Sequence, residues 1–333
     1  MLYDIIGDTH GHATKLKALF TNLGYSNRNA DGVWRHPTRI AVLVGDFVDR
    51  GDEQLEVVDI VRPMIEAGAA VACMGNHELN AVAFYMAHPE KPGDHLRTRA
   101  GSVGAKNRDQ HEAFLDAVVE DSDLHLETIK WCLTLPLWLD LPGPDGGPGI
   151  RVVHACWDPQ SMTELRGWLA PGNRLTFDRM HDATTPGHWA RDAIEIITKG
   201  PEFRLPAGHF YFDKGGSKRT KSRLKWWDPT ASTVRELSVV PPDEAAALPD
   251  TVMGNVYRPE IDGAAPTFFG HYWMSGAPAP VAATMACVDY SAGMGGDLVA
   301  YRWNGELTLD AKNFVSSAPA PVVAAAAGRR MTA

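Results

Sequence analysis

The sequence predicts an α/β fold that contains two β-sheets, and two observations support this prediction. Near the N-terminus, apolar runs typical of strands alternate with segments whose apolar residues have helical spacing. This β-α-β-α-β order is typical of a parallel sheet. Apolar runs return near the end of the chain and predict a second sheet. The expected strands are 2–6, 40–44 and 69–74, then 268–271, 285–290 and 298–303, and the first two helices are 13–23 and 53–68.

The middle of the chain adds helices and two further strands. A turn at 142–149, rich in Pro and Gly, separates two strand-like runs. Segment 89–107 is polar and contains arginines, so we expect a loop there. The expected helices are 80–86, 110–119, 124–133, 162–169 and 190–198, and the two strands are 137–141 and 150–154.

The composition is that of a globular protein with an acidic balance. Because 32 Lys and Arg stand against 41 Asp and Glu, the formal charge is −9, which disfavours general nucleic-acid binding. No apolar run reaches the roughly 20 residues that cross a bilayer, and the first strand begins at Leu2 without a secretory signal. We therefore expect a cytoplasmic protein without a membrane partner. We predict one domain over 1–315, with a basic insertion near 199–230, and an Ala/Pro-rich tail over 316–333.

Three short segments follow the first three predicted strands and carry metal-binding side chains. They are Gly7-Asp8-Thr9-His10-Gly11, Gly45-Asp46-Phe47-Val48-Asp49-Arg50-Gly51 and Gly75-Asn76-His77-Glu78. The carboxyl ends of parallel strands meet at one edge of a sheet, where α/β proteins bind ligands. We therefore expect Asp8, Asp46 and Asn76 to lie close together.

These segments resemble the motifs of the calcineurin-like metallophosphoesterases, which read Asp-x-His, Gly-Asp-x-x-Asp-Arg and Gly-Asn-His-Glu, followed by two later histidines. The resemblance implies a four-layer α/β/β/α sandwich of two mixed sheets flanked by helices. It also implies two divalent metal ions, with Mn expected and Fe, Zn, Ni or Co as alternatives. Asp46 would bridge the two ions. The implied metal ligands are Asp8, His10, Asp46, Asn76, His154 and His271.

His154 and His271 are chosen as the later histidines because each follows a strand-like run, Val152-Val153 and Phe268-Phe269. Other histidines are interpreted as surface or packing residues, and the four cysteines, which are far apart, as buried free thiols. Those histidines are His12, His36, His88, His181, His188 and His209, and the cysteines are Cys73, Cys132, Cys156 and Cys287.

The resemblance also implies roles in catalysis for three residues of these motifs. The planar cation of Arg50 suits two phosphate oxygens, and the alternative is an ion pair with Asp49 or Asp52. His77, oriented by Asp49, would donate a proton to the leaving group. Glu78 is interpreted as structural, as a cap of the following helix.

Two further features bear on substrate binding. A second phosphate-binding arginine is often present in relatives, and Arg97 or Arg99 is the candidate here. Residues 199–225 contain eight Lys and Arg against two acids, a net charge of +6, and Trp226 and Trp227 follow. This stretch either binds additional phosphates or forms a solvated hairpin with its tryptophans in the core, and the hairpin is the preferred interpretation.

The segment Gly270-His271-Tyr272-Trp273 has no second histidine, although many phosphodiesterases of the superfamily have one there. This departure resembles the branch with phosphoprotein phosphatases and symmetrical diadenosine tetraphosphate hydrolases. We therefore expect a phosphoric ester hydrolase in which metal-bound hydroxide attacks a phosphorylated substrate. A Ser/Thr protein phosphatase-like phosphomonoesterase is expected first, a dinucleoside polyphosphate hydrolase is the alternative, and a non-catalytic metal-binding interaction module is a remote one.

Overall fold

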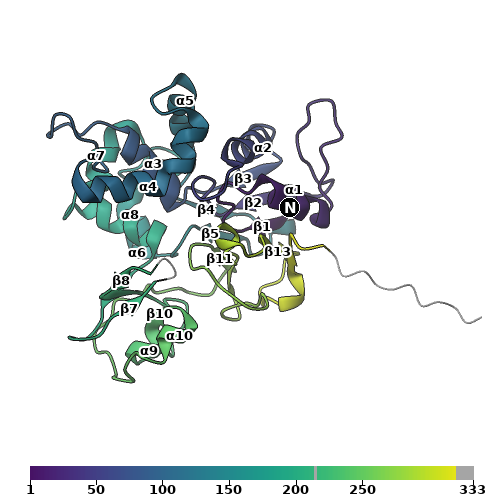
Figure 1. Ribbon diagram of the computed structural model, residues 1–333. Coiled ribbons are helices and arrows are strands. Elements are labelled where there is room, and N and C mark those ends of the chain that lie inside the picture. Colours follow the sequence, from purple (N-terminus) through teal and green to yellow (C-terminus); the bar gives the residue numbers. More distant parts are fainter. Residues whose placement is uncertain (214–215, 320–333) are drawn as a thin grey trace, which may run out of the picture.

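The computed structural model describes residues 1–213 and 216–319 and contains two large mixed sheets (Figure 1). The first has the order β14-β13-β1-β2-β3, in which β1, β2 and β3 are parallel and β13 is antiparallel to β1. Its strands are β1 (Leu2–Ile6), β2 (Arg39–Leu43), β3 (Ala70–Ala72), β13 (Val299–Trp303) and β14 (Phe314–Ser316).

The second sheet has the order β12-β11-β5-β4. Strand β11 is parallel to both β5 and β12, and β4 is antiparallel to β5. Its strands are β4 (Trp138–Leu141), β5 (Ile150–Val153), β11 (Thr267–Phe269) and β12 (Met285–Cys287). The late strands therefore divide between the sheets, because β13 and β14 join the first one.

The two sheets pack face to face, and helices cover their outer faces. Ile5 and Val42 of the first sheet share one buried cluster with Val152 and Phe268 of the second. Alternate residues point the other way, and Leu43 packs in the cluster that includes the first two helices, α1 (Ala13–Leu23) and α2 (Gln54–Glu66). Helices α6 (Pro159–Arg166) and α8 (Trp189–Lys199) belong to the same outer cluster beside the second sheet. The predicted layered fold of two mixed sheets with flanking helices is confirmed.

Helices α3, α4 and α5 pack against one another beyond β3 (Figure 1). They are α3 (Asn76–Tyr85), α4 (Gly101–Val118) and α5 (Asp123–Cys132), and α7 (Met180–Thr184) follows later. The predicted loop 89–107 is wrong from Gly101 on, because α4 begins there. A Cβ atom at position 104 would lie 2.1 Å from the carbonyl carbon of Arg99, which is too close. The glycine at this position therefore allows the helix to begin at Gly101.

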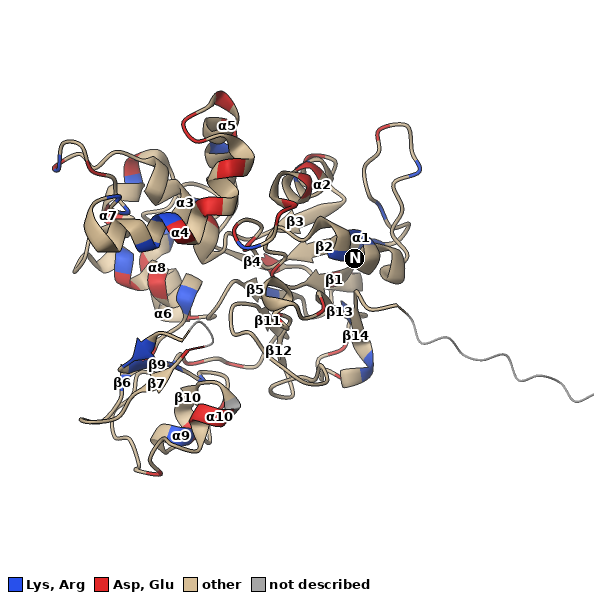
Figure 2. Ribbon diagram, in the orientation of Figure 1, with Lys and Arg blue, Asp and Glu red and all other residues tan. Residues whose placement is uncertain are grey.

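The basic insertion forms a small sheet and a hairpin of its own. Its Lys and Arg residues lie mainly on the strands (Figure 2). Trp226 and Trp227 are buried, as the hairpin interpretation predicts. Lys214 and Gly215 lie outside the described residues. The elements are β6 (Glu202–Arg204), β9 (Lys221–Leu224) and β10 (Ser238–Val239) in one sheet, β7 (Tyr211–Phe212) with β8 (Lys218–Arg219), and the short helices α9 (Val234–Leu237) and α10 (Pro242–Ala245).

Four 3₁₀ turns complete the described chain, namely η1 (Pro144–Gly146), η2 (Phe177–Arg179), η3 (Ala292–Met294) and η4 (Ala311–Asn313). Most of the predicted tail, 320–333, lies outside the described residues. Ser316 still belongs to β14, where its carbonyl accepts a hydrogen bond from Asn22. Among the described residues, no helix is long and apolar enough to span a membrane. The division into a domain and a tail stays a prediction.

Candidate metal centre and active site

The predicted ligands come together where strands of both sheets end. Asp8 and Asp46 follow β1 and β2, Asn76 begins α3 after β3, and His154 and His271 follow β5 and β11. All five, and His10 with them, are at most 7% exposed. The backbones of His10, Asp46 and His271 have positive φ angles of 43°, 54° and 72°, which non-glycine residues seldom adopt. Such strained turns are typical of functional sites, where they aim side chains inward.

The side chains form two groups of possible metal ligands that share Asp46. One group contains His10, Asp46 and His77, and the other contains Asp46, His154 and His271. Within each group the ligand atoms lie within 4.8 Å of one another. Asp46 Oδ2 is 3.3 Å from His154 Nε2 and 3.6 Å from His10 Nε2. This arrangement places Asp46 between two candidate cation positions.

Unpartnered polar atoms test whether cations fit these positions. Asp8 Oδ1, His10 Nε2 and His271 Nε2 are buried and have no hydrogen-bond partner among the residues that the structure describes. Buried polar atoms are seldom left without partners, and each costs about 1–3 kcal/mol when it is. Carboxylate, amide and imidazole donors suit divalent ions such as Mn, Fe or Zn. The residues therefore fit divalent cations, which would satisfy these atoms.

The ring orientation of two histidines supports the same assignment. His10 Nδ1 lies 3.2 Å from the carbonyl oxygen of Val48, and His154 Nδ1 lies 2.8 Å from that of Val44. An Nδ1–H donated to a carbonyl fixes the tautomer in which Nε2 keeps its lone pair for a metal. Asp8 is outside the two groups, but its Oδ2 accepts the backbone N–H of His271, so the two candidate ligands are held together.

Burial and like charge shape the electrostatics of the carboxylates. Burial raises the pKa of Asp8 well above its usual value, and the nearby carboxylates of Asp289 and Asp46 add to this effect. Burial lowers the pKa of His10 to about 3, so this ring is neutral and available as a ligand at pH 7. Cations between these carboxylates would offset their repulsion.

We expect cation binding to raise the unfolding temperature, because a ligand that binds only the folded protein stabilises it. At a concentration 100-fold above the dissociation constant the gain is about 2.7 kcal/mol. Differential scanning fluorimetry with and without Mn²⁺ measures the shift. His10→Ala should reduce it, whereas His12→Ala, in the same loop but outside the candidate ligand groups, should keep it. An equal shift in both variants contradicts the assignment of His10.

His77 belongs to one of the two groups by distance, but its ring is bound to Asp49. Its Nδ1 is 2.5 Å from Asp49 Oδ2, and its Nε2 is 3.9 Å from Asp46 Oδ2. Burial lowers the pKa of His77, but Asp46 and Asp49 outweigh it, so the net pKa is raised. Burial raises the pKa of Asp49, but His111 and His77 lower it to about 2. The pair is therefore suited to hold a proton on His77.

Arg50 extends from the same loop to the protein surface. Its guanidinium carbon lies 4.3 Å from the centre of the Trp273 ring, in a cation–π contact. Within the described chain, Arg50 forms no ion pair with Asp49 or Asp52. Trp273, which stands where related motifs have a second histidine, therefore supports the arginine instead of binding metal.

The two other candidate arginines, Arg97 and Arg99, already have partners within the protein. Arg99 forms an ion pair with Glu120 at 3.0 Å and donates to the carbonyl of Phe84. Arg97 donates to Gln110, and its buried Nε has no partner. The basic insertion contributes a different arginine, because Arg223 Nη1 donates to the carbonyl of His271 over 3.5 Å.

Several residues outside the predicted set support the site. The carboxylate of Glu78 accepts the backbone N–H groups of Gly75, Asp46 and Phe47, so its predicted capping role is confirmed. Asp289 accepts the backbone N–H groups of Trp273 and Ser291. Asp289 lies inside the predicted strand 285–290, but β12 ends at Cys287, so in the structure Asp289 follows a strand much as Asp8 and Asp46 do.

Six histidines are interpreted as surface or packing residues, and the cysteines are predicted to be buried free thiols. None of the histidines interpreted as surface or packing residues belongs to the ligand groups found among the described residues. All four cysteines are buried and free. Burial raises the pKa of the Cys156 thiol well above its usual value, which disfavours a reactive thiolate next to His154.

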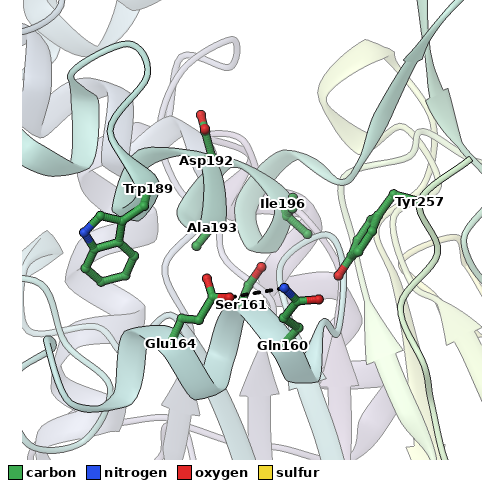
Figure 3. Close-up of a pocket in the computed structure, with 8 residues that line it drawn as sticks. All are labelled: Gln160, Ser161, Glu164, Trp189, Asp192, Ala193, Ile196 and Tyr257. Atoms are coloured by element: carbon green, nitrogen blue, oxygen red, sulfur yellow. Dashed lines mark hydrogen bonds between the residues drawn. The ribbon is translucent and has the colours of Figure 1, made fainter.

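Two hollows lie outside the metal centre. One, of about 500 Å³, is lined by residues that include Met274, Tyr290 and Met294, and Met294 also contacts Arg50. The other, of about 220 Å³, lies between α6 and α8. Figure 3 shows Glu164, Trp189 and Tyr257 around it, and neither candidate ligand group is part of this hollow.

Comparison with known proteins shows what this chain is similar to. Residues 1–150 match the family model of calcineurin-like phosphoesterases, which confirms the predicted resemblance. The chain is 34% identical over 114 residues to the asymmetrical bis(5'-nucleosyl)-tetraphosphatase PrpE of Bacillus subtilis (strain 168), covering 34% of this chain and 46% of the relative. It is 26% identical over 223 residues to the symmetrical bis(5'-nucleosyl)-tetraphosphatase of Nitrosococcus oceani, covering 67% and 60%.

Solved structures also match the chain, at low similarity. A protein serine/threonine phosphatase from Saccharomyces cerevisiae matches with a TM-score of 0.44 and 14% sequence identity, covering 95% of this chain and 78% of that one. The aligned part of the chain spans less than two thirds of the length of the two curated relatives above.

Proposed function

We propose that this protein is a phosphoesterase that uses two divalent cations to hydrolyse phosphate esters. The observation that carries the proposal is the position of Asp46, which two groups of ligands share, next to the His77–Asp49 pair. Two cations bound there would supply Lewis-acid stabilisation of the phosphoryl group and activation of water. Manganese and a cytoplasmic location remain predictions of the sequence.

The residues around the centre have complementary roles in this reaction. Arg50 binds phosphate oxygens, because its guanidinium reaches the surface next to the ligands and Trp273 holds it. His77 donates its Nε2 proton to the departing alkoxide, and Asp49 orients its ring. The reaction is a single in-line displacement without a covalent intermediate.

A phosphomonoester of a protein or a comparable small molecule is the first candidate substrate, because one exposed arginine beside the centre suits a terminal phosphate. A dinucleoside polyphosphate is the second candidate, and two observations favour it. The curated relatives reported above are bis(5'-nucleosyl)-tetraphosphatases. The hollow of about 500 Å³ beyond Arg50 also has room and thioether and aromatic surface for a nucleobase.

A substrate panel tests the proposed function. The full-length protein, loaded with Mn²⁺, is assayed with p-nitrophenyl phosphate, a phosphoserine peptide and a dinucleoside tetraphosphate. Hydrolysis of the first establishes the reaction class, and the ratio of kcat/KM values for the other two selects the substrate. A folded, metal-loaded protein that hydrolyses none of them would be a metal-binding interaction module instead.

Neutralising Arg223 is expected to weaken the binding of polyphosphorylated substrates selectively. Of the basic residues at 218, 219, 221 and 223, Arg223 is the one bonded to a candidate metal ligand, whereas Arg219 is paired with Asp213 at 2.6 Å. Arg223→Gln should raise KM for the tetraphosphate roughly 10-fold with little change in kcat, as expected when uniform binding is lost. Lys221→Gln, an exposed neighbour on β9, is the matched control, and equal effects of the two changes would contradict the assignment.

A further inference from the structure

A second histidine contacts the carboxylate that holds His77. His111, on α4, is completely buried, and its Nδ1 lies 2.8 Å from Asp49 Oδ2 and 3.0 Å from Oδ1. The same Oδ2 lies 2.5 Å from Nδ1 of His77. One carboxylate oxygen therefore sits between two imidazole rings that come from different helices, α3 and α4.

The surroundings of His111 determine which nitrogen carries its proton. Its Nε2 is buried and has no hydrogen-bond partner in the described part of the chain, and the ring packs against Phe84 with centroids 5.4 Å apart. A buried N–H donor without a partner is rarer in proteins than a buried acceptor without one. A proton on Nδ1 is therefore the favoured arrangement, and Nδ1 donates it to Asp49.

This hydrogen bond fixes a carboxylate that has few other supports. Asp49 lies in a loop with a positive φ of 69°, and Gln54 accepts its backbone N–H but does not hold its side chain. Within the described chain, the hydrogen bonds to the Asp49 carboxylate come from His77 and His111. Without His111, the hydrogen bond to His77 is the one left on the carboxylate among the described residues, and the ring of His77 loses its fixed direction.

We propose that His111 is a positioning residue that locks the Asp49 carboxylate and, through it, directs His77 Nε2 at the leaving group. This inference rests on the proposed function for its kinetic consequences. Its structural part, a fixed His77 ring, does not depend on the reaction.

A pair of substitutions of similar size separates hydrogen bonding from packing. His111→Asn keeps a donor near the position of the ring Nδ1, and His111→Leu removes it. For an alkyl phosphate, His111→Leu should lower kcat about 10- to 100-fold, the usual effect of losing a group that orients a site residue. His111→Asn should restore most of this loss, and neither change should alter KM or metal content.

A comparison of two leaving groups separates positioning from packing, because a packing role would lower both rates equally. p-Nitrophenolate needs little protonation when it departs, so the loss in His111→Leu should be much smaller with p-nitrophenyl phosphate. His125→Leu is the matched control, because His125 is also buried and contacts Phe114 and Tyr85 instead of Asp49. It should leave the ratio of the two rates unchanged.

Nuclear magnetic resonance tests the structural part separately. In full-length protein labelled with ¹⁵N-histidine and loaded with diamagnetic Zn²⁺, the Nδ1 protons of His77 and His111 should appear downfield of the amides. His111→Asn should preserve the His77 signal, and His111→Leu should broaden it. If these signals are present but the protein has no hydrolytic activity, the proposed function is refuted and the positioning role of His111 is not. Equal losses in the Asn and Leu variants, or equal losses for both leaving groups, would refute the positioning role.

Discussion

Replacement of Asp46 by asparagine is expected to abolish binding of both cations and to lower kcat/KM by more than about 10³-fold. The reason is that Asp46 belongs to both groups of ligands, at 3.3 Å from His154 Nε2 and 3.6 Å from His10 Nε2. An amide at this position loses the negative charge that two cations would share. Elemental analysis after dialysis, together with the p-nitrophenyl phosphate assay, measures both effects.

Changes to ligands that belong to one group serve as controls for this prediction. His10→Asn and His271→Asn should each retain about one cation per chain, because each removes a ligand from a single group. If Asp46→Asn keeps both cations, or if His10→Asn loses both, Asp46 does not bridge them.

Replacement of His77 by asparagine is expected to lower kcat roughly 10²- to 10⁴-fold while metal content changes little. His77 holds its proton through Asp49 at 2.5 Å, and asparagine cannot donate a proton to an alkoxide. The loss should be largest for alkyl phosphates and smaller for p-nitrophenyl phosphate. An equal loss for both substrates would leave His77 an electrostatic role instead of a general-acid role, and a large loss of bound metal would make it a ligand.

Asp49→Asn should reproduce part of this defect, since His77 would lose its orienting anion while the ring remains. Comparing the two variants across a series of leaving groups tests whether the residues act together. If His77 and Asp49 act as one unit, the double variant should be about as slow as His77→Asn alone.

The positions of the candidate ligands could be predicted from the sequence because the information is local. Each candidate lies within four residues of the end of a strand, and neighbouring strand ends bring such residues together wherever their connections run. Asp8, Asp46 and Asn76 lie where that rule places them.

The residues that support the site were harder to predict, because they contact it from distant parts of the sequence. No motif marks His111, although Phe114, Leu115 and Val118 follow it at helical spacing and place it on the buried face of α4. The predicted helix 110–119 included His111, and what the sequence missed was the first part of α4, because segment 89–107 is polar and contains arginines. The approach of Arg223 to His271 depends on how the insertion packs, and nothing in the local sequence specifies this.

The carboxylate of Glu78 has a consequence for how cations enter the protein. It accepts hydrogen bonds from Asp46 and Phe47 in one ligand loop and from Gly75 in the next, so the two loops move as one body. The conformational entropy of arranging these ligands is therefore lost when the chain folds, before any ion arrives. A centre that is ordered in advance takes up ions without a slow rearrangement step, and the rate of metal uptake should then rise in proportion to metal concentration without reaching a plateau.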